Sequence, residues 1–239
     1  MPRVREIVSA VIPCLDEEDA IGAVVSAVLA QGVTEVIVVD GASADRTAER
    51  AIAAGARVIV EPRRGYGRAI QAGLAALRED VKIVIFLDGD GSDPAEFIPA
   101  LIAPIEAGEA DFVLGSRIRG KRDPGSLSPQ QVAAGLIGGL LLKIVYGVHF
   151  SDLSPFRAIR RDALRRLGMR DMTYGWNLEM LMRVAAAGLP TLEIAVGHRR
   201  RIGGVSKVSG NFGAGIKAAM VIATTFVRLA LSLRRERRP

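Results

Sequence analysis

The stretch VKIVIFLDGDGSDP, residues 81–94, joins an apolar run to a turn of carboxylates and then to a proline. The apolar run is rich in Val and Ile, which predicts a buried strand, and Pro94 predicts the first turn of a helix. Asp88, Asp90 and Asp93 fall between the two, at the point where the strand ends. Strand, polar turn and helix form the unit from which the fold can be worked out.

The same unit recurs on the N-terminal side of this stretch. Apolar runs that predict strands alternate with segments of helical spacing, and a further strand follows the helix that begins at Pro94. The expected strands cover 7–15, 33–40, 56–62, 81–88 and 110–116, and the expected helices cover 19–31, 45–54 and 67–78. Near-continuous apolar strands separated by helices predict an α/β fold with a mainly parallel central sheet flanked by helices.

The regular alternation stops after residue 116. The expected elements are a Gly-rich apolar helix, a short strand, two helices, a second short strand and a terminal helix. In this order they cover 131–147, 156–160, 161–167, 176–187, 191–196 and the segment from about 212. In parallel sheets ligands bind beyond the carboxyl ends of the strands, so we expect the functional residues there.

Length and composition indicate one folded domain. The chain has 239 residues, 49% of them hydrophobic, enough to bury a large core. We expect a catalytic domain over 1–210 and a basic amphipathic helix over 211–239. No stretch has the roughly 20 apolar residues of a membrane span, and the N-terminus lacks the pattern of a secretory signal. Cys14 is the single cysteine, so the expected location is the cytoplasm.

The charge balance indicates an acidic partner. The net charge is +6, which suits nucleic acid, anionic lipid or phosphorylated substrates. Aromatic residues make up 5% and do not interleave with the arginines, so a nucleic-acid partner is not expected. In the tail, Lys217, Arg228 and Arg235 fall on one narrow stripe of an otherwise apolar helix. This pattern suits a helix at a membrane surface, a dimer contact or packing against the core.

The acidic turn is the strongest chemical signal. Asp88 and Asp90, separated by one glycine, can converge on Mg²⁺ or Mn²⁺, with phosphate oxygens completing the coordination. For Asp93 the favoured interpretation is structural: an N-cap with Pro94 at the first helical position. Asp40 ends the second strand, where it would approach a nucleotide base or ribose, unless Ser43 or Asp45 merely caps the next helix.

Two basic loops complement these acids. GSRIRGKR (115–122) and HRRRIGGVSK (198–207) combine glycines with guanidinium and ammonium groups that can neutralise a diphosphate, although solvated loops have the same composition. His149 and His198 are expected to be structural. RRGYGRA does not follow a strand in the G-x-G-x-x-G pattern, which argues against a Rossmann dehydrogenase.

Seven segments, taken in order, resemble glycosyltransferase family 2, in the branch of dolichyl-phosphate mannosyltransferase and polyprenyl-phosphate glycosyltransferases. They are VIPCLDEE, VVDGASAD, LDGDGSDP, GSR, SDLSPFRAIRR, YGWNLEM and RRIGGVSK, spread over about 7–210. The resemblance implies a GT-A fold, with a Rossmann-like nucleotide-binding half and an acceptor half. It also implies a Mg²⁺ or Mn²⁺ cofactor, an inverting mechanism and a nucleoside-diphosphate hexose donor.

The resemblance also implies roles for individual residues. Asp90, Asp152 and Arg117 would be catalytic. The sugar nucleotide would contact Pro13, Leu15, Glu17, Asp40, Ser43, Asp88 and Gly89. The metal would lie at Asp90, with Ser92 and Asp88, and phosphates would lie at Arg117, Arg201, Ser206 and Lys207. The acceptor would approach Asp152, Glu179 and Trp176. The chain departs from the family at Gly41, where an acid is usual, and at Ser92, where some relatives have an amide.

The expected reaction is transfer of mannose or glucose to a polyprenyl phosphate by an enzyme at the cytoplasmic membrane face, with a homo-oligomer left open. A phosphate acceptor is already anionic and needs little base catalysis. The alternative is a soluble or other lipid hydroxyl acceptor, for which Asp152 would be the base. A nucleotidyltransferase should carry a Gly-rich, Lys-bearing loop after the first strand, and PCLDEE does not. A binding module without catalysis is the remaining alternative.

Overall fold

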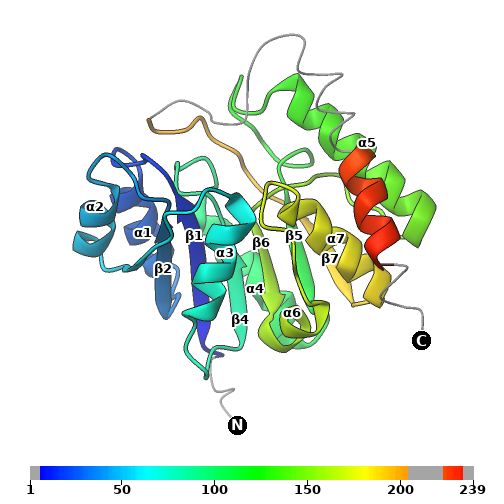
Figure 1. The fold of residues 1–239 in the computed structure, drawn as a ribbon, viewed down its shortest axis with the longest axis horizontal. Helices are drawn as coiled ribbons and strands as arrows, with labels where there is room; N and C mark the ends of the chain where they lie inside the picture. The colour runs from blue at the N-terminus through cyan, green and yellow to red at the C-terminus, as the bar shows by residue number, and fades with distance from the viewer. Residues whose placement is uncertain (1–5, 204–222, 234–239) are drawn as a thin grey trace.

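A seven-stranded sheet forms the centre of the computed structural model, which describes residues 6–203 and 223–233. The strand order is β3-β2-β1-β4-β6-β5-β7, and only β6 runs antiparallel to its neighbours in this sheet. The strands are β1 (Val8–Cys14), β2 (Glu35–Asp40), β3 (Arg57–Val60), β4 (Ile83–Phe86), β5 (Phe112–Ser116), β6 (Arg157–Arg160) and β7 (Thr191–Ala195). The predicted mainly parallel α/β sheet is confirmed (Figure 1).

Helices cover both faces of the sheet, as the apolar strands require. One face carries α1 (Ile21–Ala30), α2 (Thr47–Ala53), the short 3₁₀ helix η1 (Ala95–Phe97) and α4 (Ile98–Ala107). The other carries α3 (Tyr66–Ala75), α5 (Pro129–Tyr146), α6 (Arg161–Leu167) and α7 (Trp176–Ala187). In β1, Ala10 and Ile12 pack into the first layer and Val11 into the second, so this strand is buried on both sides.

The register aligns the polar loops at one edge of the sheet. Cys14 at the end of β1 pairs with Asp40 at the end of β2, and Val11 pairs with Phe86 near the end of β4. Because β6 is antiparallel, its first residue, Arg157, lies opposite Phe86 at this same edge. The loops after β1, β2 and β4 and the segment before β6 therefore converge.

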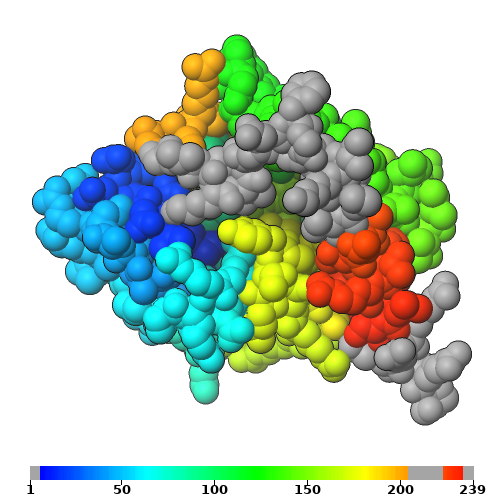
Figure 2. Space-filling view, turned by 45° about the horizontal axis from the view of Figure 1, so that its top comes forward, coloured from blue at the N-terminus to red at the C-terminus, as the bar shows by residue number. Residues whose placement is uncertain are grey.

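The terminal segment is helical over 223–233 and packs against the second layer. Phe226, Leu229 and Leu233 are buried, and the rings of Phe226 and Tyr146 lie 6.4 Å apart. Figure 2 shows this helix in red beside the yellow α7. The Phe226 side of this helix thus packs against the core, whereas Val227 and Leu231 are 56% and 51% exposed, so the membrane and dimer alternatives stay predictions. None of the described helices has the length and apolarity needed to cross a membrane.

Candidate active site

The loops after β1 and β2 are locked together. The amide of Asp16 donates to Ser43 Oγ (2.9 Å), and the amide of Ala44 donates back to Asp16 Oδ1 (2.8 Å). Asp40 accepts hydrogen bonds from the amide and hydroxyl of Ser43, which brings these two predicted nucleotide-site residues into contact. Asp16 and Ala42 have left-handed backbones, with φ of 51° and 58°. Such conformations are costly for residues with a Cβ and concentrate at ligand sites.

The backbone between these loops is tightly packed around Cys14. The amide of Gly41 donates to the Cys14 carbonyl (2.8 Å), and Leu15 lies directly beside Gly41. A Cβ at Gly89 would lie 2.3 Å from Cys14 Sγ, so Gly89 brings the acidic turn against β1. Burial, reinforced by the nearby carboxylates, raises the pKa of the Cys14 thiol well above its usual value. Pro13 and Leu15, which flank Cys14 in the sequence, are partly buried.

Asp90 lies at the centre of the acidic turn. Its Oδ1 accepts a hydrogen bond from the amide of Ser92 (2.9 Å), and its Oδ2 lies 3.2 Å from Arg201 Nη2. The same guanidinium nitrogen lies 2.9 Å from Glu17 Oε1. Arg201 therefore bridges carboxylates from the loops after β1 and β4, and it brings three of the predicted site residues together.

The interpretation of Asp93 as the cap of the following helix was wrong. Pro94 is extended (φ −72°, ψ 113°), the first turn is the 3₁₀ helix η1, and no side chain caps it. Instead, Asp93 turns back and accepts a hydrogen bond from the Asp88 amide (3.1 Å). Its Oδ1 lies 3.7 Å from Nδ1 of the buried His198. Asp93 thus belongs to the acidic turn, and His198 has the packed position expected of a structural residue.

Negative charge is concentrated in this turn. Burial, followed by the nearby carboxylates of Asp93 and Asp90, raises the pKa of Asp88 well above its usual value. The positive charge of Arg117 opposes this shift without cancelling it. Carboxylates crowded in this way indicate a site that a cation would stabilise.

The basic loop after β7 is hydrogen-bonded along the acidic turn. The amide of Arg199 donates to the Ser92 carbonyl (2.9 Å), and the amide of Ile202 donates to the Asp90 carbonyl (3.0 Å). At the far end of this segment, Gly203 lies against the side chain of Asp19. Figure 2 shows the orange segment in contact with the blue N-terminal part. The predicted phosphate contacts Ser206 and Lys207 lie outside the described residues.

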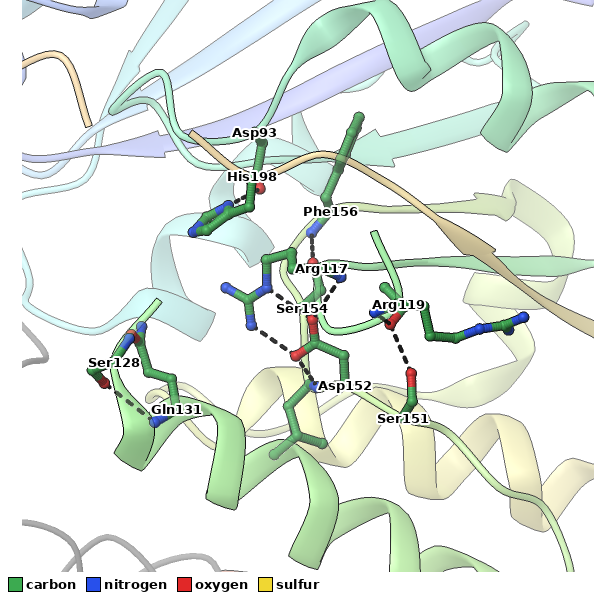
Figure 3. A network of polar contacts seen from close by, with 12 residues as sticks. Asp93, Arg117, Arg119, Ser128, Gln131, Ser151, Asp152, Ser154, Phe156 and His198 are labelled. Carbon is green, nitrogen blue, oxygen red and sulfur yellow. Dashed lines mark hydrogen bonds and ion pairs between the residues drawn. The ribbon is translucent and has the colours of Figure 1, made fainter. Parts of the chain in front are cut away.

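Arg117 and Asp152 form the second charged centre (Figure 3). Asp152 accepts hydrogen bonds from the backbone amide (2.9 Å), Nε (2.9 Å) and Nη2 (2.8 Å) of Arg117, and another from the Leu153 amide (2.7 Å). Burial alone would raise the pKa of Asp152, but the hydrogen bonds and charge of Arg117 outweigh it and lower this pKa. The interpretation of Asp152 as a general base therefore needs correction, because a fully bonded carboxylate with a lowered pKa is a weak proton acceptor. Asp152 instead positions Arg117.

Glu179 and Trp176 lie inside the protein. Glu179 accepts hydrogen bonds from the amides of Arg170 and Asp171 and from Nε of Arg183 (2.8 Å), which fixes the loop before α7. Trp176 is fully buried and packs edge-on against Phe86, with ring centroids 5.1 Å apart. The structure therefore places neither side chain where it directly meets an acceptor, because the first residues of α7 face the core.

Sequence reasoning missed Arg157 at the start of β6. Its side chain is fully buried, and its guanidinium donates to the carbonyls of Asn177 (3.1 Å) and Ser154. Burial lowers the pKa of Arg157 to about 10. The guanidinium is close enough to Asp88 and Asp152 for their negative charges to act on it. An arginine inside the apolar stretch PFRAI was the signal, because lone charges are rarely buried without a purpose.

The donor chemistry of the acidic turn fits Mg²⁺ or Mn²⁺. Within 6–203 and 223–233, no three His, Cys, Asp or Glu side chains form a ready cage for a metal ion. A cage is not required, since Mg²⁺-type sites often use one or two carboxylates and take their other ligands from water and substrate phosphates. Asp90 and Asp88 supply such carboxylates. The negative charge of Asp90 is balanced in the structure by the guanidinium of Arg201.

Comparison with known proteins agrees with this arrangement. Residues 9–168 match glycosyl transferase family 2. An uncharacterized glycosyltransferase of Mycobacterium tuberculosis is 39% identical over 216 residues, 90% of this chain and 95% of that protein. The dolichyl-phosphate hexose transferase of Haloferax volcanii is 35% identical over 192 residues, 79% of this chain and 81% of that protein.

Solved structures show the same fold. The crystal structure of a mycobacterial protein superimposes with a TM-score of 0.73 at 27% identity and covers 94% of this chain and 74% of its own. Glucosyl-3-phosphoglycerate synthase from Mycobacterium tuberculosis, crystallised with Mn²⁺, uridine diphosphate and glucosyl-3-phosphoglycerate, gives a TM-score of 0.71 at 25% identity. It covers 94% of this chain and 80% of its own. The expected GT-A fold is confirmed, and the chain belongs to glycosyl transferase family 2.

Proposed function

We propose that this protein transfers a hexose, with inversion and with Mg²⁺ or Mn²⁺ as cofactor, from a nucleoside-diphosphate sugar to a polyprenyl phosphate. One observation carries the proposal: the carboxylates of Asp90 and Glu17 meet the guanidinium of Arg201 at the carboxyl edge of the sheet. An acidic turn with an arginine beside it is suited to a metal-bound diphosphate. The carboxylates would hold the metal ion, and the guanidinium would bind the phosphate oxygens.

The donor would lie along the loops after β1, β2 and β4. Asp40 and Ser43, already in contact, suit the ribose hydroxyls and the base. Pro13, Leu15, Glu17 and the backbone at Gly89 complete this side. A related synthase crystallised with uridine diphosphate and Mn²⁺ supports a uridine nucleotide as the first one to test.

The metal would be held by Asp90, together with Asp88 and Ser92. When bound, it would neutralise charge on the diphosphate and so stabilise the leaving group. Arg201 would then exchange its carboxylate partners for phosphate oxygens, helped by Ser206 and Lys207. Arg117, oriented by Asp152, would stabilise negative charge on the donor or acceptor phosphate.

An anionic acceptor fits the state of Asp152, the residue expected to act as base for a hydroxyl acceptor. In the reaction, an acceptor phosphate oxygen forms a bond to the anomeric carbon from the face opposite the diphosphate. The bond from that carbon to the diphosphate breaks, and the nucleoside diphosphate leaves with the electron pair. No proton has to be removed from a phosphate acceptor, which suits an Asp152 whose pKa is lowered and whose oxygens are occupied. The likeness to a dolichyl-phosphate hexose transferase supports this acceptor class.

A soluble hydroxyl acceptor is the second candidate, because the chain is also similar to glucosyl-3-phosphoglycerate synthases. The synthase of Mycolicibacterium paratuberculosis is 39% identical over 160 residues, 62% of this chain and 47% of that protein. An acceptor of this type combines a hydroxyl with phosphate and carboxylate groups, which Arg117 would bind.

Product analysis separates the two. The purified protein is incubated with Mn²⁺ and radiolabelled UDP-glucose or GDP-mannose, together with undecaprenyl phosphate, dolichyl phosphate or 3-phosphoglycerate. Butanol-extractable label that requires both metal and polyprenyl phosphate supports the first proposal. Label that stays in the aqueous phase and requires 3-phosphoglycerate supports the second. Absence of transfer with every donor and acceptor contradicts both.

A further inference from the structure

Helix α5 has its small residues on the inside. Gly135, Gly138 and Gly139 are buried, and a Cβ at these positions would lie 2.9 Å from the Ile118 side chain, 3.0 Å from the Leu153 side chain and 1.7 Å from the Phe150 carbonyl oxygen. The glycines therefore let the helix backbone lie directly on the segment 150–153. A capping box at Ser128 and Gln131 fixes the start of the helix (Figure 3).

The outer face of α5 carries the large apolar residues. Leu136, Leu140 and Ile144 are 51%, 54% and 70% exposed, and their spacing of four residues places them in one row. Ile137 and Val145 widen the row, with 36% and 43% exposed. Helices of soluble proteins normally turn such residues toward the core, and a contiguous exposed apolar surface marks a site of interaction.

The exposed charges on α5 and at the start of the loop that leads to it are mostly positive. Lys143 lies on the helix and Lys121 and Arg122 lie in the loop before it, where Asp123 is the one exposed acid. Lys143 lies on α5 between Leu140 and Ile144 and is exposed. Its alkyl chain can cover apolar surface while the ammonium group reaches a phosphate. An apolar row with a cationic border matches the interfacial layer of an anionic bilayer.

We infer that the outer face of α5 is a membrane-docking surface that inserts into the interface of an anionic phospholipid bilayer. The inference extends the proposed function by placing the lipid on a defined side of the molecule. A second copy of the chain is a poorer occupant, because two such faces would bring cationic borders together in a low-dielectric contact.

Docking here would also orient the active site. A Cβ at Gly135 would lie 3.3 Å from the Cα of Asp152, so α5 packs directly behind the residue that positions Arg117. A bilayer at the outer face of α5 would therefore lie close to the Arg117 side of the site. A lipid-borne phosphate would need to travel only a short way from the headgroup layer to reach it.

The test is sedimentation of the full chain with sucrose-loaded vesicles of phosphatidylcholine, with and without 30% phosphatidylglycerol as the roughly physiological anionic fraction. The double variant Leu140→Ser/Ile144→Ser removes the centre of the row. The matched control is Ile52→Ser/Val60→Ser, since these side chains, on α2 and β3, are 60% and 59% exposed. We expect the parent and the control to bind anionic vesicles equally, and the α5 variant to bind at least about tenfold more weakly because its buried CH₂ groups are lost.

Equal binding of the α5 variant and the parent would overturn the inference, as would a parent that binds no anionic vesicle. A dimer that dissociates only in the α5 variant, measured by light scattering without lipid, would also overturn it and assign the face to a second copy. Thermal stabilisation by UDP and Mn²⁺ is measured on the same samples. This readout reports on donor binding alone, so failure of the proposed function remains distinguishable from failure of the docking surface.

Discussion

Replacement of Asp152 by Asn tests the charged pair behind the site. Asp152 is fully buried and accepts four hydrogen bonds, three from Arg117 and one from the Leu153 amide. Asparagine keeps the shape but offers one acceptor oxygen, and its NH₂ group would face the guanidinium. Breaking a buried ion pair leaves an uncompensated charge and costs about 3–5 kcal/mol. At the lower figure, and at roughly 2–4 °C per kcal/mol for a chain of this size, Tm should fall by about 6–12 °C.

The assay is urea unfolding and thermal melting of the parent, Asp152→Asn and a control, Asp162→Asn. Asp162 faces Arg165 at 4.0 Å with both side chains more than half exposed, so its loss should cost less than about 0.5 kcal/mol. The pKa of Asp152 is lowered in the folded state. The stability it supplies is therefore present above the unfolded pKa of about 3.9 and is lost as pH falls through the folded pKa. The gap between parent and variant should persist from pH 7 to 5 and narrow below about pH 4. An Asp152→Asn variant as stable at pH 7 as the Asp162→Asn control would refute the reasoning.

Three further substitutions or modifications test the rest of the site. Gly89→Ala should destabilise the fold by about 1–3 kcal/mol through overlap with Cys14 Sγ, and denaturant melts that match the parent would contradict this. Cys14 is buried and its pKa is raised, so Ellman's reagent at pH 8 should label it only as the chain unfolds; rapid labelling of the folded protein would count against the packing. Arg201→Gln should weaken UDP binding in the presence of Mn²⁺ by about tenfold, whereas Arg200→Gln, whose side chain bonds to Pro124, should have little effect in the same calorimetric titration.

The sheet and the position of the site followed from strand composition. The runs that end at Cys14, Asp40 and Asp88 are apolar at nearly every position, which is the pattern of strands buried on both faces, and their polar ends converge because the strands are parallel. Neither the sheet nor the place of the site required knowledge of how the side chains pack. The observed strands are shorter than predicted, β4 covering only Ile83–Phe86, because the residues at each end leave the ladder for the loops.

Side-chain pairing at the site was harder to predict. Asp93 precedes a proline and looks like a cap, yet the extended backbone of Pro94 directs it toward the Asp88 amide. Asp152 resembles a base in sequence, but its partner Arg117 lies 35 residues away, directly after β5. Such contacts depend on how β5 and β6 align, which local spacing does not encode.

The surfaces of the helices were the least predictable feature. The sequence predicted a Gly-rich apolar helix here but not which of its faces is buried; in the structure its glycines occupy the inner face and Leu140 and Ile144 are exposed. Conversely, the terminal helix has a basic stripe, and its described part buries Phe226, Leu229 and Leu233. Periodicity identifies a face but does not say which partner covers it.

The central claim is that Asp90 holds a divalent cation that binds the donor diphosphate. Isothermal titration calorimetry with UDP and GDP, each with and without Mn²⁺, measures this directly on the parent and on Asp90→Asn. The control is Asp80→Asn, a partly exposed residue that is paired with Arg78 and precedes β4, at the end of the strand opposite to the turn. We expect Mn²⁺ to increase the affinity of the parent and the control for at least one nucleotide by tenfold or more, on the order of 1.4 kcal/mol, and to leave Asp90→Asn unchanged. A Mn²⁺-dependent gain of the same size in Asp90→Asn would contradict the account.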